Sequence, residues 1–336
     1  MDPLALLRKA GLEAEGPALP LHGGDISRVW RVGRFVVKTA QDPPPGLFRA
    51  EARGLQALAE RGVRVPQVHW VGEEGLVLAY LEPGPEDWEG LARTLAALHR
   101  RREGSYLAEP GFLGTFPLPG REGGEWTAFF YERCVLPLLE ATWDRLQGLG
   151  PKVEALYRRP LPAEGPAPLH GDLWHGNVYF AREGPALLDP SFFVGERGVD
   201  LAMMRLFGGF PRRFWEVYGE LYPVPEEVER ALPRYQVYYL LAHVHFFGQQ
   251  NAEMRAWYEK TFSAKPRQGG GFLVADLPGV ALNFTQSPEA TVGTGGRAMD
   301  HIGFEVKGLE TFLKNLEAQG VKVTTPYRSV PALNLA

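Results

Sequence analysis

The sequence predicts an α+β protein with two lobes, a β-rich first lobe and a mainly helical second lobe, followed by a partial C-terminal module of βαβββ type. Strand-like runs separated by turns dominate the first part of the chain, apolar residues at helical spacing dominate the middle, and short strand patterns return after residue 248. The 336 residues also exceed a typical single domain. We therefore expect domains at 1–82, 83–248 and 249–336.

The first lobe contains a hairpin and a helix before a short apolar strand. A turn signal joins the strand-like runs 29–32 and 35–38. Residues 47–61 place apolar side chains at helical spacing, and 75–81 form an apolar strand. The Pro/Gly-rich stretch 82–85 then predicts the boundary between the lobes.

The second lobe is predicted to be mainly helical around a small β core. The elements that we expect are a helix from Trp88, a Gly/Pro-rich loop at 110–124, a helix over 126–146, a strand at 186–188, and helices at 200–207 and 210–221. After it, the expected elements of the third unit are strands at 272–274, 280–284 and 302–306 and helices at 252–262 and 309–319.

Composition limits the partners of the chain. The formal net charge of −4 gives no basic excess for binding nucleic acid or an anionic membrane. A single cysteine, Cys134, excludes an intramolecular disulfide, and no apolar run reaches the roughly 18 residues of a spanning helix. We expect a soluble, cytoplasmic protein with no nucleic-acid or membrane partner. Its oligomeric state does not follow from the sequence.

The stretch HGDLWHGN, residues 170–177, concentrates polar side chains. His170, Asp172 and His175 invite comparison with a zinc site, but on a loop no helical period aligns them, and no carboxylate stands at a familiar zinc-protease spacing. Phosphoryl transfer explains more of the residues. In protein kinases the Asp of a His-x-Asp motif accepts a hydroxyl proton, and an Asn five positions later holds magnesium. Asp172 and Asn177 have that spacing.

Kinase chemistry requires further groups on both sides of this loop. A second metal-binding Asp is expected one hairpin downstream, and Asp189 follows the apolar pair at 187–188. Upstream, the order must be a glycine-containing phosphate loop, a strand lysine and a helix glutamate. The residues that fit this order, together with further candidates for contacts with the nucleotide, are Gly23, Gly24, Asp25, Ser27, Lys38, Glu51, Tyr80 and Leu81.

Each of these residues has a simpler interpretation. The glycine pair is also typical of an ordinary turn, and Lys38 and Glu51 are also typical of solvated surface charges. Asp200 is either only the N-cap of the next helix or a cap that also braces the catalytic loop. Trp174 either fills the core or faces the substrate. The joint order and spacing of the set favour the kinase interpretation.

These segments together resemble the fructosamine kinase family, also called ketosamine kinases, within the aminoglycoside phosphotransferase-like group. The resemblance covers residues 1 to about 248. The stretches that carry it are GGDIS, FVVK, EARGLQAL, LARTLAALHR, APLHGDLWHGN, LLDPSFF and DLAMMRLFGGF. It implies a bilobal protein-kinase-like fold that uses ATP and Mg²⁺ to phosphorylate a sugar hydroxyl of a small-molecule or protein-bound ketoamine.

The resemblance also implies a role for each residue. Asp172 is the base, Asn177 and Asp189 bind Mg²⁺, and Lys38 and Glu51 position the phosphates. On the acceptor side Trp174 faces the sugar, His175 lies near the substrate or faces solvent, and His170 and Asp200 support the loop.

The tail resembles the glyoxalase/dioxygenase superfamily through HVHFF, GVALNF and GRAMDHIGFEVKGLETFLKNLEAQGV. That resemblance makes His243 or His245, together with His301, candidate metal ligands. However, HVHFF would have to be both the end of a kinase helix and the first strand of the tail, and the chain stops before the closing strands that bring an acidic ligand. We expect a natural or artefactual fusion with a truncated, metal-free tail.

Three other functions each fit part of the sequence. One is a kinase for an aminoglycoside or a choline-like amine, which differs in the acceptor pocket. Another is a non-catalytic nucleotide-binding module, which the presence of Lys38, Asp172, Asn177 and Asp189 disfavours. The third is metal-dependent lyase or dioxygenase chemistry in the tail. The sequence does not distinguish the preferred sugar or amine, nor free from protein-bound substrates.

Overall fold

The computed structural model describes residues 2–13, 16–21, 27–146, 148–262, 265–269, 272–277 and 280–284, with side chains up to residue 246. Contacts between Cα atoms divide the chain into two units, Met1–Gln249 and Gln250–Ala336.

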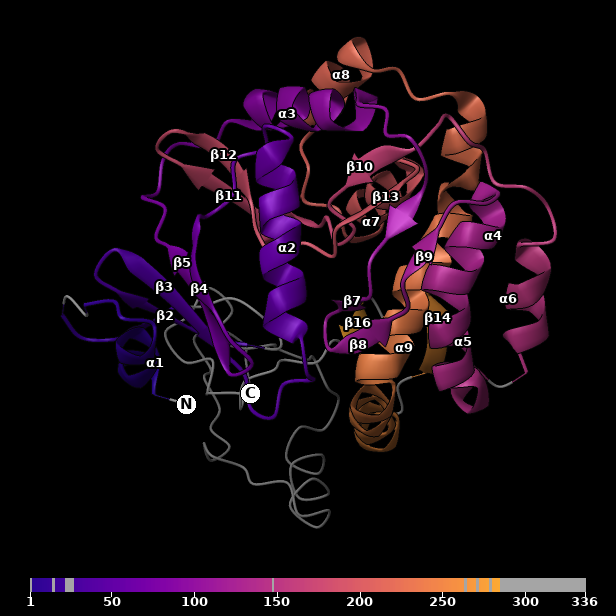
Figure 1. Ribbon diagram of the computed structural model, residues 1–336. Coiled ribbons are helices and arrows are strands. Elements are labelled where there is room, and N and C mark those ends of the chain that lie inside the picture. The colour runs from indigo at the N-terminus through magenta and orange to yellow at the C-terminus, as the bar shows by residue number, and fades with distance from the viewer. Residues whose placement is uncertain are drawn as a thin grey trace, which may run out of the picture. The chain divides into compact units, whose positions relative to one another are not determined.

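The first lobe is a five-stranded antiparallel sheet with the strand order β1-β2-β3-β5-β4, flanked by two helices. Figure 1 shows α2 standing between β5 of this sheet and β7 of the second lobe, and α2 contacts both strands. The strands are β1 Leu19–Leu21, β2 Arg28–Val32, β3 Phe35–Thr39, β4 Val68–Val71 and β5 Gly75–Ala79, and the helices are α1 Pro3–Lys9 and α2 Leu47–Glu60.

Local sequence signals account for the first lobe. Gly33 has a φ of 55°, a left-handed conformation that glycine adopts without strain, and it turns β2 into β3. The apolar side of α2 buries Phe48, Leu55 and Leu58. The chain leaves α2 through Gly62, with a φ of 81°. The predicted hairpin and helix are confirmed.

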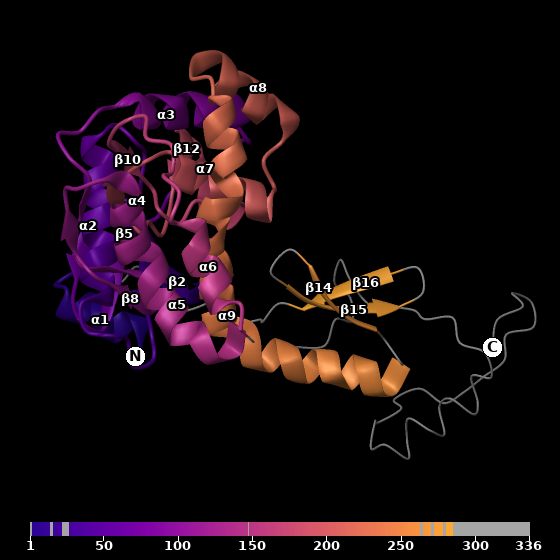
Figure 2. The same cartoon turned by 90° about the vertical axis from the view of Figure 1, so that its right-hand side faces the viewer.

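The second lobe is mainly helical, as predicted. Figure 2 shows its helices from the side. They are α3 Trp88–Arg100, α4 Trp126–Phe130, a π-helix Tyr131–Val135, α5 Leu136–Thr142, a 3-10 helix Trp143–Leu146, α6 Gly150–Leu156, a 3-10 helix His175–Asn177, α7 Gly198–Phe207, α8 Arg212–Leu221 and α9 Glu226–Phe262.

Short strands support the loops of the second lobe. One antiparallel sheet has the order β10-β13-β6-β9, and β7-β8 and β11-β12 are hairpins. The strands are β6 Leu107–Ala108, β7 Gly111–Leu113, β8 Phe116–Leu118, β9 Arg121–Glu122, β10 Ala167–Leu169, β11 Val178–Ala181, β12 Gly184–Leu187 and β13 Phe193–Gly195. The predicted loop at 110–124 therefore contains β7, β8 and β9.

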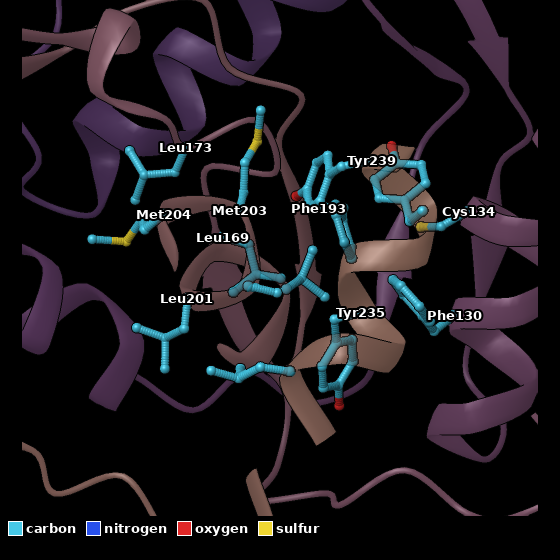
Figure 3. Packing of buried hydrophobic residues seen from close by; sticks show 14 of the residues in the cluster. Phe130, Cys134, Leu169, Leu173, Phe193, Leu201, Met203, Met204, Tyr235 and Tyr239 are labelled. Carbon is cyan, nitrogen blue, oxygen red and sulfur yellow. The ribbon is translucent and has the colours of Figure 1, made fainter. Parts of the chain in front are cut away.

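The large apolar core lies in the second lobe and surrounds the segment that carries HGDLWHGN. Figure 3 shows Leu169 and Leu173 beside side chains of α7 and α9. Leu169, Leu173 and Leu201 are each 1% exposed or less. Burial of such side chains contributes roughly 1.5–3 kcal/mol each, so the first half of this polar loop is held by a rigid core.

Two boundaries differ from the prediction. Helix α7 begins at Gly198, so Asp200 is its third residue and Arg197 occupies the N-cap; the interpretation of Asp200 as an N-cap is wrong. Residues 243–247 lie within α9, so they do not form the first strand of the tail. Helix α9 buries apolar side chains from Val228 to Ala242, and its continuation through 243–247 overrides the strand-like composition of that segment.

The described part of the second unit contains the end of α9 and a three-stranded antiparallel sheet in the order β14-β15-β16. The strands are β14 Lys265–Gly269, β15 Phe272–Leu277 and β16 Val280–Phe284. The expected strand 302–306, helix 309–319 and His301 lie outside the described residues. No helix in the described ranges is long and apolar enough to cross a membrane.

Candidate active site

A cavity of about 770 Å³ in the first unit brings together residues that are distant in sequence. Its wall includes β3, α2, the loop 172–177 and the segment 188–194. The predicted site residues in this wall are Ser27, Lys38, Glu51, Tyr80, Leu81, Asp172, Trp174, Asn177 and Asp189. Lys38 comes from the first lobe and Asp172 and Asp189 from the second, so the cavity lies between the two lobes.

Lys38 joins the two lobes through its ammonium group. Its Nζ lies 2.7 Å from Oε1 of Glu51 on α2 and 2.6 Å from Oδ1 of Asp189. The Lys38 and Glu51 side chains are only 7% and 14% exposed, so the charge-assisted hydrogen bond between them is shielded from water, whereas the Asp189 side chain is 40% exposed. Asp189 has a φ of 53°, an uncommon left-handed conformation that asparagine and aspartate tolerate best.

Electrostatics in this trio follow from one cation between two carboxylates. Burial raises the pKa of Glu51 to about 7, because the nearby Asp189 adds to the effect of burial and only Lys38 opposes it. Burial also acts on Asp189, but the attraction of Lys38 outweighs it and lowers the pKa of Asp189. Burial opposes the charge of Lys38, yet the two carboxylates together raise the pKa of Lys38. Lys38 therefore stays charged.

His170 fixes the loop to the end of β12. Its Nε2 lies 2.7 Å from the carbonyl oxygen of Leu188, and its Nδ1 accepts the backbone N–H of Asp172 at 3.2 Å. The two bonds require a neutral ring with its proton on Nε2. Burial lowers the pKa of His170, which agrees with that neutral form. The His170 side chain thus links the residue before Asp189 to the backbone of Asp172.

Gly171 and Asn177 hold the rest of the loop. Gly171 has a φ of 81°, and a Cβ atom at this position would lie 2.0 Å from the carbonyl oxygen of Ser191. Only glycine fits here. The Asn177 amide nitrogen donates to the carbonyl oxygen of Asp172 at 2.7 Å. The 3-10 turn that contains Asn177 is therefore tied directly to the backbone of Asp172.

Asp200 supports the loop from α7. Its Oδ2 accepts the backbone N–H of His170 and its Oδ1 that of Gly171, both at 2.8 Å. The Nε2 of His99 lies 3.2 Å from Oδ2, and the Tyr239 hydroxyl donates to the Gly171 carbonyl at 2.9 Å. Burial acts against the Asp200 charge, but His99 and the other donors lower the pKa of Asp200. A buried anion with this many donors braces the loop.

Two aromatic side chains of the loop lie at its surface. Trp174 is 38% exposed and lines the cavity, so its interpretation as a core residue is wrong. His175 is exposed, and its ring stacks on Trp88 with centroids 5.7 Å apart. Trp174 thus faces the cavity, whereas His175 packs against α3.

The segment after β5 connects the lobes and is bonded to the β11-β12 hairpin. The Tyr80 N–H donates to the carbonyl of Arg34 at 2.8 Å, and Leu81 accepts the Tyr179 hydroxyl at 3.0 Å. Gly84 donates to the Phe180 carbonyl at 2.9 Å. These bonds fix the connection beside the cavity.

Some expected residues are not part of this cavity or are not described. Gly23, Gly24 and Asp25 lie outside the described residues. His243 and His245 are on α9, where His243 stacks on Phe207 and His245 meets the Phe116 ring edge-on. In the described part of the chain, no group of three or more His, Cys, Asp or Glu side chains could hold a metal.

Sequence reasoning missed three residues that position the site. His99 contacts Asp200, Tyr179 contacts the connection at Leu81 and Tyr239 contacts the loop at Gly171, across 101, 98 and 68 residues respectively. A histidine on the otherwise apolar face of the helix LARTLAALHR is a signal for His99, because a fully buried imidazole needs a partner. The tyrosines carry no comparable local signal.

Comparison with known proteins agrees with this geometry. The sequence profile described as "Fructosamine kinase" matches residues 11–260. A Thermus thermophilus protein named "Probable ketoamine kinase" is 99% identical over 249 residues, which are 74% of this chain and 95% of that protein.

Solved structures show the same fold. A Thermobifida fusca crystal structure titled "putative fructosamine-3-kinase" is 30% identical with a TM-score of 0.64, covering 73% of this chain and 92% of that one. The streptomycin-ATP-APH(2″)-IIa complex is 15% identical with a TM-score of 0.53, covering 74% and 91%, and shows the fold alone. The predicted two-lobed, kinase-like α+β fold is confirmed. Because the family profile spans most of the chain, this protein belongs to the fructosamine kinase family.

Proposed function

We propose that the cavity transfers the γ-phosphoryl group of ATP to a sugar hydroxyl of a ketoamine. Family membership makes the chain a phosphotransferase of the ketoamine kinase type. The observation that supports the mechanism is the meeting of Lys38, Glu51 and Asp189 in the same cavity wall as Asp172 and Asn177. These are the groups that phosphoryl transfer needs, because its catalysis is mostly positioning and charge stabilisation.

On the nucleotide side, Lys38 binds the α- and β-phosphate oxygens and Glu51 holds Lys38 in place. The 2.7 Å pair between them supports this role. The backbone of Tyr80 and Leu81 lies at the adenine end. Since the Leu81 carbonyl already accepts the Tyr179 hydroxyl, the position of this segment is set before a nucleotide arrives.

Asn177 and Asp189 would hold Mg²⁺. Both line the cavity, and the Asn177 amide nitrogen is engaged by the Asp172 carbonyl, which leaves its oxygen as the atom available to a cation. A pair of oxygen donors suits Mg²⁺, which proteins usually bind through one or two carboxylates together with substrate phosphates. When bound, the ion supplies positive charge against the phosphate oxygens.

Asp172 acts as the base. It accepts the proton of the sugar hydroxyl while that oxygen bonds to the γ-phosphorus and the bond from phosphorus to the ADP oxygen breaks. His170, Gly171 and Asp200 position its backbone. Trp174 lies at the cavity wall on the acceptor side, where an indole face suits the apolar side of a sugar ring.

A substrate panel with Mg-ATP tests this function. Ribuloselysine and fructoselysine should be phosphorylated, whereas an aminoglycoside and choline should not. Preferential turnover of the aminoglycoside or of choline would instead favour a kinase for an aminoglycoside or a choline-like amine. Glycated protein in the same panel distinguishes protein-bound from free substrates. We also place this activity in the cytoplasm, where ATP and sugar-derived ketoamines meet.

A further inference from the structure

Arg133 is a buried cation in the wall of the same cavity. Its side chain is 1% exposed, and the residue lines the cavity together with Asp172 and Trp174. Neither its Nε nor its Nη1 has a hydrogen-bond partner among the described residues. Buried arginines are normally paired, because an isolated charge away from water costs several kcal/mol. Arg133 therefore differs from Arg197, which is equally buried but bonds Glu164 at 2.7 Å.

The helix around Arg133 is distorted in a way that its sequence explains. Pro137 has no N–H to donate to the carbonyl of Arg133 four residues earlier. The chain forms a π-turn instead, in which the Leu136 N–H donates to the Tyr131 carbonyl five residues earlier. Single π-turns inside α-helices occur frequently at functional sites. Here the π-turn separates α4 from α5 and contains Arg133 at its centre.

The guanidinium lies over residues that line the cavity. Its Cζ is 5.4 Å from the centroid of the Phe193 ring, and a Cβ atom added to Gly111 would lie 3.8 Å from its Nη2. Both Phe193 and Gly111 belong to the cavity wall. The charged end of Arg133 is thus directed at this wall and not at the solvent.

A second unpartnered donor lies close to Arg133. The buried Tyr238 hydroxyl has no hydrogen-bond partner among the described residues, and the nearby Ser191 hydroxyl donates to the Phe112 carbonyl at 2.7 Å. Burial raises the pKa of Tyr238 well above its usual value, and Arg133 opposes this rise whereas Asp172 adds to it. The hydroxyl therefore lies within electrostatic range of both the proposed base and the unpaired cation.

We propose that Arg133 binds a carboxylate of the acceptor substrate, so that the preferred substrates are ketoamines of free α-amino acids. This inference rests on the proposed ketoamine kinase function. A planar carboxylate matches the two-pronged guanidinium and supplies the missing counter-charge, whereas a sugar hydroxyl supplies only an acceptor. Because Arg133 is enclosed, the carboxylate must enter with the sugar. A carboxylate next to the ketoamine nitrogen meets that requirement. In a glycated protein the carboxylates are separated from the sugar by a lysine side chain and the backbone, so they do not meet it.

The test uses two ketoamines that differ by one group, those formed from the same sugar with glycine and with glycinamide. Calorimetry measures their binding to the full chain, and a coupled ADP assay measures turnover. The wild-type protein should bind the glycine compound roughly 10- to 100-fold more tightly, as expected for a buried charge-assisted pair. Arg133→Met should remove that preference and leave the Kd of the glycinamide compound within about threefold of the wild-type value. Arg133→Lys should retain part of the preference for the glycine compound.

Controls separate this inference from folding and from the proposed function. Arg230→Met changes the same residue type on the exposed face of α9, where Arg230 is 69% exposed, and should keep the wild-type preference. Arg133→Met should unfold at the wild-type temperature or above it, because the change removes an unpaired buried charge. Equal wild-type binding of both compounds would overturn the carboxylate site, whatever the turnover. If Arg133→Met weakened ATP binding as much as it weakened binding of the glycine compound, Arg133 would be assigned to the nucleotide, and the carboxylate site would also be overturned. If neither compound is phosphorylated but the wild-type protein still prefers the glycine compound, the proposed kinase function is contradicted and the carboxylate site is not.

Discussion

Single side chains at this site are constrained in both position and protonation. His170 donates to the Leu188 carbonyl and accepts from the Asp172 N–H, so its ring is neutral and cannot turn over without losing both bonds. Lys38 stays charged between Glu51 and Asp189. The proposed base and the proposed metal ligand are therefore held by residues whose own states are fixed.

Replacing the proposed base tests the mechanism at this scale. Asp172→Asn keeps the size of the side chain but cannot accept the hydroxyl proton. We expect kcat to fall by about 10²- to 10⁴-fold, the usual contribution of a positioned general base, while the Kd for Mg-ATP stays near wild type. Steady-state kinetics and nucleotide titration measure the two quantities.

The matched control for this variant is Asp144→Asn. Asp144 lies on an exposed 3-10 turn, so the same chemical change there should leave kcat unaltered. A kcat of Asp172→Asn within threefold of wild type would contradict the assignment of Asp172 as the base.

At the scale of elements, the catalytic loop is clamped between α7 and the segment after Asp189. Asp200 on α7 accepts the N–H groups of His170 and Gly171. On the other side, the Ser191 carbonyl approaches the Gly171 Cα so closely that a side chain cannot be added. The loop is therefore placed by packing against two elements and not by its own hydrogen bonds alone.

A pair of glycine variants measures that clamp. Gly171 and Gly62 both have a φ of 81°, but a Cβ atom at Gly62 would meet nothing within 4 Å. Gly62→Ala should cost only the backbone strain, about 1–2 kcal/mol of unfolding free energy. Gly171→Ala should cost clearly more and should also lower kcat, because the Ser191 carbonyl or the loop must move. Denaturant unfolding and kinetics give both values, and equal costs for the two variants would show that the loop is not clamped.

The elements predicted from sequence were those with local signals. The hairpin of β2 and β3 depends on Gly33, and α2 on its own apolar spacing, so both were found. Asp200 shows the limit, because an acidic residue before an apolar run is typical of an N-cap, whereas α7 begins two residues earlier. The contacts of His99 with Asp200 and of Tyr239 with the loop depend on packing across 68 or more residues, which no local pattern records.

Across the whole first unit, the two lobes are joined by polar contacts around the cavity. Besides the pair between Lys38 and Asp189, Arg53 on α2 lies 3.2 Å from Glu109 and donates to the Pro110 carbonyl at 2.7 Å. Glu109 and Pro110 also line the cavity. The Arg53 and Glu109 side chains are 53% and 66% exposed, whereas those of Lys38 and Glu51 are 7% and 14% exposed. Folding of the unit thus buries titratable groups around the cavity, Lys38 and Glu51 among them, and its stability depends on pH through such groups.

His170 gives the sign of one such dependence. Burial lowers its pKa from 6.5 in the folded protein, so below pH 6.5 the unfolded chain takes up a proton that the folded chain does not. The free energy of unfolding should thus fall as pH drops from 6.5 toward the folded pKa, by at most about 1.4 kcal/mol per pH unit for this group. Denaturant unfolding at pH 7.5, 6.5 and 5.5 should show a shallower slope for His170→Gln. Identical slopes would contradict a neutral buried ring.

The ammonium group of Lys38 carries three hydrogens, and the bonds to Glu51 and Asp189 account for two of them. A phosphate oxygen can therefore join as a third acceptor without displacing either carboxylate. The four-carbon chain of Lys38 is already ordered by those two bonds, so a nucleotide would not have to restrict its rotation on arrival. The Lys38 side chain is therefore preorganised for a phosphate before the nucleotide binds. Preorganisation raises the affinity for the nucleotide without any additional contact.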